Sequence, residues 1–222
     1  IMYEKYIIKK PIRLIELLGG YGSQHFSLKY LGADVEHWKL CEWAVKSIQA
    51  YKDAHCEDET DYSKDMTKEE LINYLFNKGI SQNYNEPMTL QQIKRQNEKW
   101  LRTVYNNIIA TKNLVNIQQV KGSDLEIVDT DKYEYIMTYS FPCQDLSLAG
   151  KRAGMSDTST RSGLLWEVER ILDECEELPQ VLLMENVPQV IGKDNVEHFN
   201  KWQLKLEQLG YKNYHQNLNG AL

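Results

Sequence analysis

The sequence predicts an α/β domain with a mostly parallel sheet and helices on both faces, because apolar strand-like segments alternate with helical ones. Residues 12–18 and 133–140 are rich in apolar, β-branched or aromatic residues, and small or polar residues follow each of them, as is typical of strands. Residues 181–187, VLLMENV, begin with a continuous apolar run that indicates a central strand, covered on both faces.

Weaker patterns complete the expected sheet, with strands at residues 35–43, 115–120 and 211–219. Helices are expected at residues 24–32 and 44–51. Two apolar stripes at helical spacing predict later helices, the second ending at Gly210; they are Leu164, Leu165, Val168, Ile171 and Leu172, and Phe199, Trp202, Leu206 and Leu209.

Residues 57–114 interrupt this alternation, and we expect a helical insertion within a single domain of residues 1–222. Thr67 with Glu70, and Thr89 with Gln92, fit capping boxes that open helices. The insertion is interpreted as a packing subdomain, with a lid or a nucleic-acid-facing element as the alternative. Its apolar stripe consists of Trp100, Leu101, Val104, Tyr105, Ile108 and Ile109.

The bulk composition of the 222 residues is globular, with 42% hydrophobic and 26% charged residues. A net charge of -6 argues against binding of nucleic acid through bulk charge, although a local basic cleft remains compatible with it. No apolar run of about 18 residues occurs, so no membrane segment is expected. The four cysteines form no CxxC pair, which favours a reduced, cytoplasmic protein without a zinc site or a disulfide framework.

Three glycines follow the first predicted strand in LLGGYGS and open a helix. Gly19, Gly20 and Gly22 would let the backbone approach a ligand closely. Their G-G-x-G pattern does not satisfy the dinucleotide fingerprint, and a plain tight turn is an equal alternative.

Two acids strengthen the ligand interpretation. Glu42 falls at the end of the second predicted strand, where a carboxylate is placed to accept hydrogen bonds from ribose hydroxyls. Trp43 beside it could stack on adenine, and Asp124 could accept a hydrogen bond from an adenine amine. Each acid alone also fits a solvated surface group. Together with the glycines they predict a nucleoside pocket, without a required phosphate because the loop holds no Lys or Arg.

Cys143 follows Pro142 at the carboxyl end of a predicted strand, where open α/β sheets bind ligands. The residues alone leave open a nucleophile or an inert buried thiol. Glu185 ends the apolar run at 181–184, so we expect it to be partly desolvated and to act as an acid, or to bind a helix N-terminus. Asn186 could hold a neighbouring loop by side-chain hydrogen bonds.

The motifs FPCQDLS, MENV, CEW, GSDL and RSGLLWEVERI occur in an order and spacing that resemble the DNA (cytosine-5) methyltransferases. The resemblance covers most of residues 12–220. It implies a Rossmann-like S-adenosylmethionine-dependent methyltransferase fold and methyl transfer to carbon 5 of cytosine in double-stranded DNA.

The resemblance also implies roles for individual residues. Cys143 would attack carbon 6 of a cytosine flipped out of the duplex, and Glu185 would protonate its N3. Pro142 would fix the backbone ahead of the cysteine, and Asn186 would hold the cysteine loop. The cofactor contacts would be Leu18, Gly20, Gly22, Ser23, Glu42, Trp43, Asp124, Leu125 and Leu164, and the DNA-contacting loop would use Gln144, Ser147, Lys151, Arg152 and Arg161.

The sequence departs from the family pattern at several points. Leu18 replaces the usual Phe, and Tyr139 and Ser140 stand where glycines are usual. The family's Gln-x-Arg-x-Arg motif, target-recognition region and final helix do not follow. We therefore expect the catalytic and cofactor-binding half of an enzyme of restriction–modification or phage type, completed by a second chain or a C-terminal region. The alternatives are a non-catalytic or split S-adenosylmethionine-binding fragment, and a tRNA cytosine-5 methyltransferase.

Overall fold

The computed structural model describes residues 6–140, 163–193 and 196–219. They divide into two compact units. The first contains residues 6–140 and 171–184, and the second contains residues 163–170, 185–193 and 196–219.

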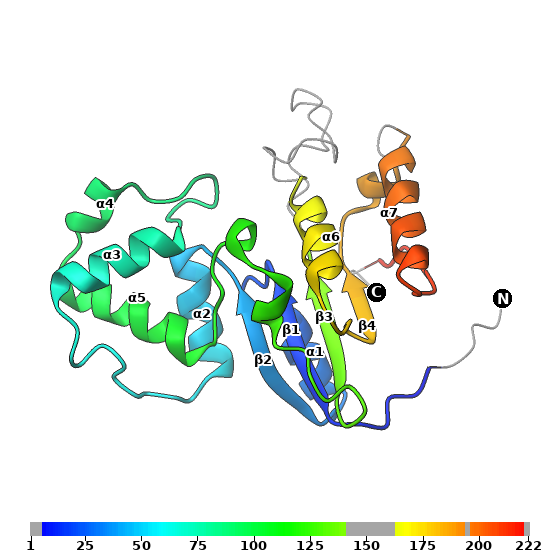
Figure 1. Cartoon of the computed structure of the whole chain (residues 1–222), viewed down its shortest axis with the longest axis horizontal. Coiled ribbons are helices and arrows are strands. Elements are labelled where there is room, and N and C mark those ends of the chain that lie inside the picture. Colours follow the sequence, from blue (N-terminus) through cyan, green and yellow to red (C-terminus); the bar gives the residue numbers. More distant parts are fainter. Residues whose placement is uncertain (1–5, 141–162, 194–195, 220–222) are drawn as a thin grey trace. The chain divides into compact units, whose positions relative to one another are not determined.

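The first unit contains a four-stranded parallel sheet in the order β2-β1-β3-β4 (Figure 1). Its strands are β1 (Ile12–Leu17), β2 (Val35–Cys41), β3 (Glu134–Tyr139) and β4 (Val181–Met184). In the register, Leu17 pairs with both Cys41 and Tyr139, and Tyr139 pairs with Met184. The carboxyl ends of all four strands therefore lie at one edge of the sheet, and the prediction of a parallel α/β fold is confirmed.

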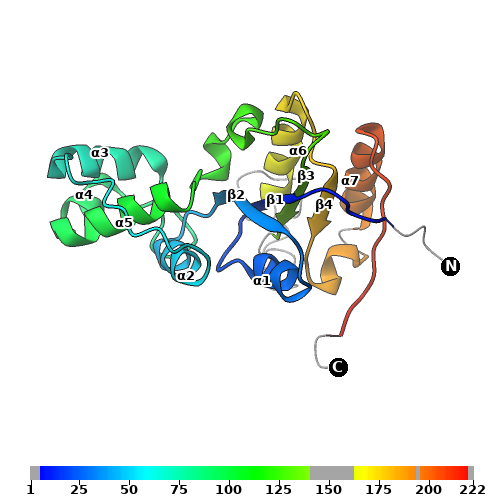
Figure 2. The same cartoon turned by 90° about the horizontal axis from the view of Figure 1, so that it is seen from below.

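Helices cover both faces of this sheet. Figure 2 shows α1 (Ser23–Tyr30) on one face and the last turn of α6 (Leu164–Glu174) on the other. Only the last turn of α6 belongs to the first unit, and its residues Ile171 and Leu172 are buried. Helix α2 (Val45–His55) follows β2.

Residues 57–114 contain three helices, α3 (Lys68–Lys78), α4 (Leu90–Lys94) and α5 (Glu98–Ala110). Thr67 with Glu70 and Thr89 with Gln92 both form the predicted capping boxes. In the apolar stripe of α5, Leu101, Val104 and Ile108 are buried in a core shared with α2 and α3. The stripe therefore packs in a helical core that also includes α2, which precedes residues 57–114.

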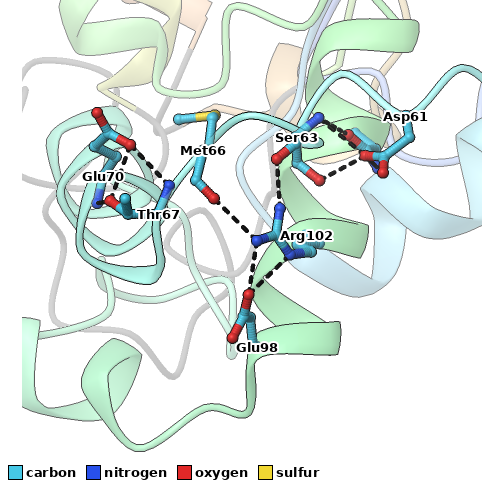
Figure 3. Close-up of polar contacts among 8 residues, drawn as sticks. Asp61, Ser63, Met66, Thr67, Glu70, Glu98 and Arg102 are labelled. Atoms are coloured by element: carbon cyan, nitrogen blue, oxygen red, sulfur yellow. Dashed lines mark hydrogen bonds and ion pairs between the residues drawn. The ribbon is translucent and has the colours of Figure 1, made fainter.

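Arg102 of α5 ties the irregular chain ahead of α3 to this core (Figure 3). Its guanidinium donates to the carbonyls of Ser63 and Met66, the latter at 2.9 Å, and to Glu98 Oε1 at 2.6 Å. A planar guanidinium has donors enough for all three acceptors. The segment that leads into α3 is thereby held to α5.

Two predicted strands are absent. Within residues 115–120, Ile117–Gln119 form a short 3-10 helix, η1, because Val115 adopts a φ of 70° and the Asn116 side chain accepts from the Gln118 amide. Residues 211–219 have no regular structure, and Tyr214 and Leu218 are largely exposed, so their alternating pattern meets no sheet partner among the described residues.

The predicted central position of residues 181–187 is also wrong. Among the described strands, β4 pairs only with β3 and lies at the edge of the sheet. It is four residues long, and Leu183 is 50% exposed. An apolar run alone does not distinguish a central strand from an edge strand, because both bury at least part of their side chains.

The second unit contains the start of α6, the 3-10 helix η4 (Pro188–Ile191) and α7 (Val196–Gln208). The rings of Trp166 and Trp202 meet edge to face, with 6.5 Å between their centroids. Two further apolar residues of α7, Phe199 and Leu206, are also buried. Gly210, with a φ of 96°, follows the helix as predicted. No helix in the described part of the chain is long and apolar enough to cross a membrane.

Candidate functional site

The turn at Leu18–Gly22, called the glycine loop below, joins the carboxyl end of β1 to α1. Three of its five residues have a left-handed backbone: Leu18 at φ 55°, Gly20 at 56° and Gly22 at 80°. A non-glycine residue in this region costs roughly 1–2 kcal/mol, so the conformation at Leu18 needs support from its surroundings. Within the loop, the Gly22 amide donates to the Gly19 carbonyl at 2.9 Å.

The glycine loop has one open side and one filled side. A Cβ at Gly20 would meet nothing within 4 Å, whereas a Cβ at Gly22 would lie 2.5 Å from His55 Nε2 and 2.7 Å from the Tyr51 ring. A Cβ at Gly19 would lie 2.7 Å from Leu40. The loop therefore rests on the protein at Gly19 and Gly22, while its backbone at Gly20 is open to close approach by a ligand.

Glu42 follows β2 directly and reaches the glycine loop, as the sequence predicts. Its Oε2 accepts from the Gly20 amide at 3.0 Å, and its Oε1 accepts from the Ala44 amide at 2.7 Å. Asn113 fixes the Glu42 backbone by accepting from its amide at 3.0 Å and donating to its carbonyl at 2.9 Å. The carboxyl group is thus held in one orientation beside Gly20.

The carboxyl group of Glu42 is close to its titration point at neutral pH. Glu42 is 6% exposed, and this burial raises the pKa of its carboxyl to about 7, against the lowering effect of the Ala44 and Gly20 amides. A carboxylate with two backbone donors keeps further lone pairs, so it can still accept from a ligand hydroxyl.

The amino terminus of α1 is a second polar feature beside the loop. Gly22 is its N-cap residue and supplies no side-chain hydrogen bond. Ser23 instead donates to the Gln24 side chain at 2.9 Å. The His25 amide of this turn is directed at the Glu16 carboxyl, so the Ser23 and Gln24 amides are the ones that retain capacity for an anionic or hydroxyl group of a ligand.

The first unit also contains three residues that the sequence predicts as adenine contacts: Trp43, Asp124 and Leu125. Trp43 is half-buried against the core of the helical segment, and its carbonyl accepts from the Ser81 amide at 2.8 Å. Asp124 lies in the 3-10 helix η2 (Gly122–Leu125) rather than at a strand end, and its Oδ2 accepts from the Lys121 amide at 2.8 Å. Leu125 is fully buried.

Three predicted site residues belong to the second unit. Leu164 is the first residue of α6 and is half-buried. Glu185 is exposed, so the expected desolvation of its carboxyl is wrong for this structure; it directly follows a short edge strand that provides little cover. The Oδ1 of Asn186 accepts from the Val187 amide at 2.8 Å.

The proposed nucleophile and its loop lie outside the described residues. They are Pro142, Cys143, Gln144, Ser147, Lys151, Arg152 and Arg161. Their roles stay predictions from the sequence.

Sequence reasoning missed a buried polar layer beneath the glycine loop. Glu16 of β1, His37 of β2 and Tyr51 of α2 are joined through the Tyr51 hydroxyl, which lies 2.5 Å from Glu16 Oε2 and 2.9 Å from His37 Nδ1. His25 of α1 is also buried here, with Nδ1 at 3.4 Å from the same hydroxyl. The available signal was the single acid inside the apolar strand at 12–18, since a buried charge needs polar partners.

The hydrogen bonds of this layer require one extra proton. His37 Nε2 lies 2.6 Å from the Thr111 carbonyl, which can only accept, so Nε2 carries a proton. Burial lowers the pKa of His37 to about 4, so Nδ1 is a bare acceptor at neutral pH. One Tyr51 proton cannot serve both His37 and Glu16. Burial raises the pKa of Glu16 to about 7, which lets its carboxyl hold the additional proton.

The same layer contains the one set of metal-ligand side chains found in the described part of the chain, Glu16, His25 and His37, with ligand atoms within 4.8 Å of one another. The Tyr51 hydroxyl hydrogen-bonds to Glu16 and to both histidines, and so lies among these atoms. We interpret the set as a hydrogen-bonded layer centred on Tyr51 rather than as a metal site.

Comparison with known proteins identifies the family. The family model for C-5 cytosine-specific DNA methylase matches residues 76–221. The orphan methyltransferase M.SssI of Spiroplasma monobiae is 40% identical over 220 residues, which cover 96% of this chain and 55% of the relative. The type II methyltransferase M2.ScrFI of Lactococcus lactis subsp. cremoris is 33% identical over 215 residues, covering 94% of this chain and 56% of the relative.

The chain therefore spans about half the length of these relatives. A solved structure, of the S. pombe Dnmt2 methyltransferase, aligns with 86% of this chain and 41% of that chain at 16% identity, with a TM-score of 0.46. The family-model match covers more than half of the chain, and the chain belongs to the C-5 cytosine-specific DNA methylase family.

Proposed function

We propose that this chain binds S-adenosylmethionine at the glycine loop and Glu42, and uses it to methylate carbon 5 of cytosine in DNA. The observation that carries the proposal is the contact between the Gly20 amide and Glu42 Oε2 at 3.0 Å, beside a Gly20 whose Cβ direction is open. In a family of DNA cytosine methylases, an open backbone next to a fixed carboxylate suits a methyl-donating nucleoside.

The residues present fit that cofactor. The carboxyl of Glu42 would accept from the ribose hydroxyls, and the Ser23 and Gln24 amides at the start of α1 would receive the cofactor carboxylate. Leu18, Gly22 and Ser23 would line the loop side. Trp43, Asp124 and Leu125 would contact the adenine, and Leu164 would contact the methionine side.

In the proposed chemistry, the cofactor supplies the methyl group and the chain supplies the nucleophile. The Cys143 thiolate would form a bond to carbon 6 of a flipped-out cytosine while Glu185 protonates N3. Carbon 5, made electron-rich, would take the methyl group. A base would then remove the carbon-5 proton, and the bond to Cys143 would break. Pro142 and Asn186 would hold the cysteine loop in place.

DNA would be held partly by phosphate contacts from the same loop. Lys151, Arg152 and Arg161 carry positive charge for the backbone, and Gln144 and Ser147 can donate to phosphate or base. A net charge of -6 on this chain suggests that a second chain or a further region supplies additional DNA contacts and the target specificity.

The relatives suggest the biological setting. The name of the Lactococcus relative describes a type II methyltransferase, so we propose a restriction–modification role, in the cytoplasm, for the protein that contains this chain. We propose further that residues 1–222 act as one cofactor-binding catalytic domain into which the helices of residues 57–114 are inserted.

The proposal is tested by calorimetric titration of the chain with S-adenosylmethionine. We expect saturable binding that Glu42→Ala weakens by at least tenfold, since the variant removes the acceptor for the ribose and for Gly20. Lys46→Ala, on the exposed side of α2, is the matched control and should bind as the unmodified chain does. Binding that is absent, or that Glu42→Ala leaves unchanged, would overturn the assignment of the cofactor site.

A further inference from the structure

We propose that His55 is a positioning residue for the glycine loop: its Nε2–H holds the Tyr21 carbonyl while its ring fills the space under Gly22. The inference rests on the proposed cofactor site, and it assigns a role to a residue of α2 that no sequence motif singles out.

The contacts on the underside of the loop carry this inference. His55 Nε2 lies 3.0 Å from the Tyr21 carbonyl. A Cβ at Gly22 would lie 2.5 Å from Nε2 and 2.7 Å from Cδ2 of His55, so the loop backbone lies directly on the imidazole. A side chain larger than hydrogen at position 22 would lift the loop off its support.

The imidazole is itself held in place by other rings. It stacks on His25 at 4.4 Å between centroids with an interplanar angle of 9°, and it contacts Phe26 at 4.2 Å and Tyr51 at 4.8 Å. Tyr51 is anchored in turn by its hydrogen bond to Glu16 of β1. The support under the loop is therefore connected to the central sheet.

The contact with the Tyr21 carbonyl determines which ring nitrogen of His55 carries the proton. A carbonyl oxygen only accepts, so Nε2 carries the proton. Nδ1 is buried and has no hydrogen-bond partner among the described residues, and burial lowers the pKa of the ring. His55 is thus a neutral imidazole with one donor, and that donor is directed at Tyr21.

His55 and Glu42 hold two peptide groups of the glycine loop that are separated by one further peptide group. Glu42 accepts from the Gly20 amide, and His55 donates to the Tyr21 carbonyl. Because Leu18 has a strained positive φ and the glycines leave the rest of the loop backbone free to adopt other conformations, the loop conformation depends on such external contacts. A loop fixed in advance binds its ligand without the entropic cost of ordering it.

The test separates the hydrogen bond from the ring. His55→Phe keeps an aromatic ring on His25 and under Gly22 but removes the donor. His55→Gln restores a side-chain N–H of similar reach. Lys46→Ala is the control on the same helix. The measurements are the Kd for S-adenosylmethionine by calorimetry, the amide hydrogen exchange of residues 19–23 in the ligand-free chain, and the thermal midpoint.

We expect His55→Phe to weaken cofactor binding by about fivefold and to speed exchange across residues 19–23, which is the effect of losing one neutral hydrogen bond. His55→Gln should return the affinity to within about twofold of the unmodified chain. A merely structural role would lower the thermal midpoint without this rescue.

Equal affinity and equal exchange in His55→Phe would overturn the inference while leaving the proposed function standing. If the unmodified chain does not bind S-adenosylmethionine, the proposed function fails instead. The exchange comparison then still decides the role of His55: faster exchange at residues 19–23 in His55→Phe supports it, and unchanged exchange refutes it.

Discussion

Glu42 Oε2 accepts a hydrogen bond from the Gly20 amide at 3.0 Å, which joins the residue after β2 to the turn after β1. The two residues are 22 positions apart in sequence, and the parallel pairing of Leu17 with Cys41 brings them together. The buried carboxyl lies beside the backbone of Gly20, whose Cβ direction is open.

Cofactor binding should depend on pH through Glu42. Burial raises the pKa of its carboxyl to about 7, and ribose hydroxyls pair with the ionised form. The ionised fraction falls as the pH drops through 7, so the affinity for S-adenosylmethionine should be about tenfold weaker at pH 6 than at pH 8. Calorimetry across this range measures it. Glu42→Gln should bind S-adenosylmethionine weakly and with a smaller pH dependence. If the affinity of the unmodified chain does not change between pH 6 and pH 8, Glu42 does not act as the ionised acceptor of the ribose.

Asp124→Ala should weaken cofactor binding by roughly 1–3 kcal/mol if its carboxylate is a partner of the adenine amine. The same carboxylate accepts from the Lys121 amide, so the thermal midpoint must be measured beside the affinity. Asp124→Asn retains an acceptor oxygen, so it should weaken cofactor binding less than Asp124→Ala does. Unchanged affinity in Asp124→Ala would remove this residue from the pocket.

The buried layer under the loop should make stability depend on pH through Glu16. Burial raises the pKa of this carboxyl from 4.5 to about 7 in the folded chain. Its contribution to the free energy of unfolding is therefore complete below pH 4.5 and is lost as the pH rises through 7. The loss is at most about 3 kcal/mol.

Urea unfolding at pH 5, 6, 7 and 8 measures this dependence. Glu16→Gln cannot ionise, so its free energy of unfolding should fall less steeply over this range than that of the unmodified chain. Parallel curves for the two proteins would show that Glu16 does not titrate in the folded state.

Arg102→Ala should lower the free energy of unfolding by about 1–3 kcal/mol, because it leaves the carbonyls of Ser63 and Met66 without their charged donor. Glu98→Ala removes only the partly exposed ion pair with Arg102 and should cost less than about 1 kcal/mol. Denaturant titration compares the two variants. Equal losses would indicate that the ion pair, and not the contacts to the chain ahead of α3, stabilises this segment.

The sequence was sufficient for features that depend on local chemistry. The capping residues Thr67 and Thr89, the stripe around Leu101, and the strand and helix on either side of the glycine loop follow from spacing and residue type, and the structure has them where they are expected. The approach of Glu42 to Gly20 also follows, because parallel strands end at the same edge of a sheet.

Features that depend on distant partners could not be predicted in the same way. The 3-10 helix at Ile117–Gln119 replaces a strand because contacts from Asn113 and Cys41 hold Val115 at a φ of 70°, which a β-branched residue rarely adopts. The edge position of β4 depends on strand pairing, which composition does not encode. The buried layer of Glu16, His37 and Tyr51 brings together side chains from β1, β2 and α2. No local sequence motif predicts that these side chains contact one another.

The central claim, that this chain methylates cytosine through Cys143, is tested most directly by covalent trapping. The protein is incubated with S-adenosylmethionine and a pool of DNA duplexes that carry 5-fluorocytosine in random sequence contexts, so that the unknown target is represented. Because fluorine cannot leave as a proton does, the intermediate stalls. We predict a DNA adduct that mass spectrometry maps to Cys143 and that Cys143→Ser abolishes without loss of cofactor binding. A protein that binds both the cofactor and the duplex pool yet forms no adduct, or an adduct that persists in Cys143→Ser, would contradict the claim.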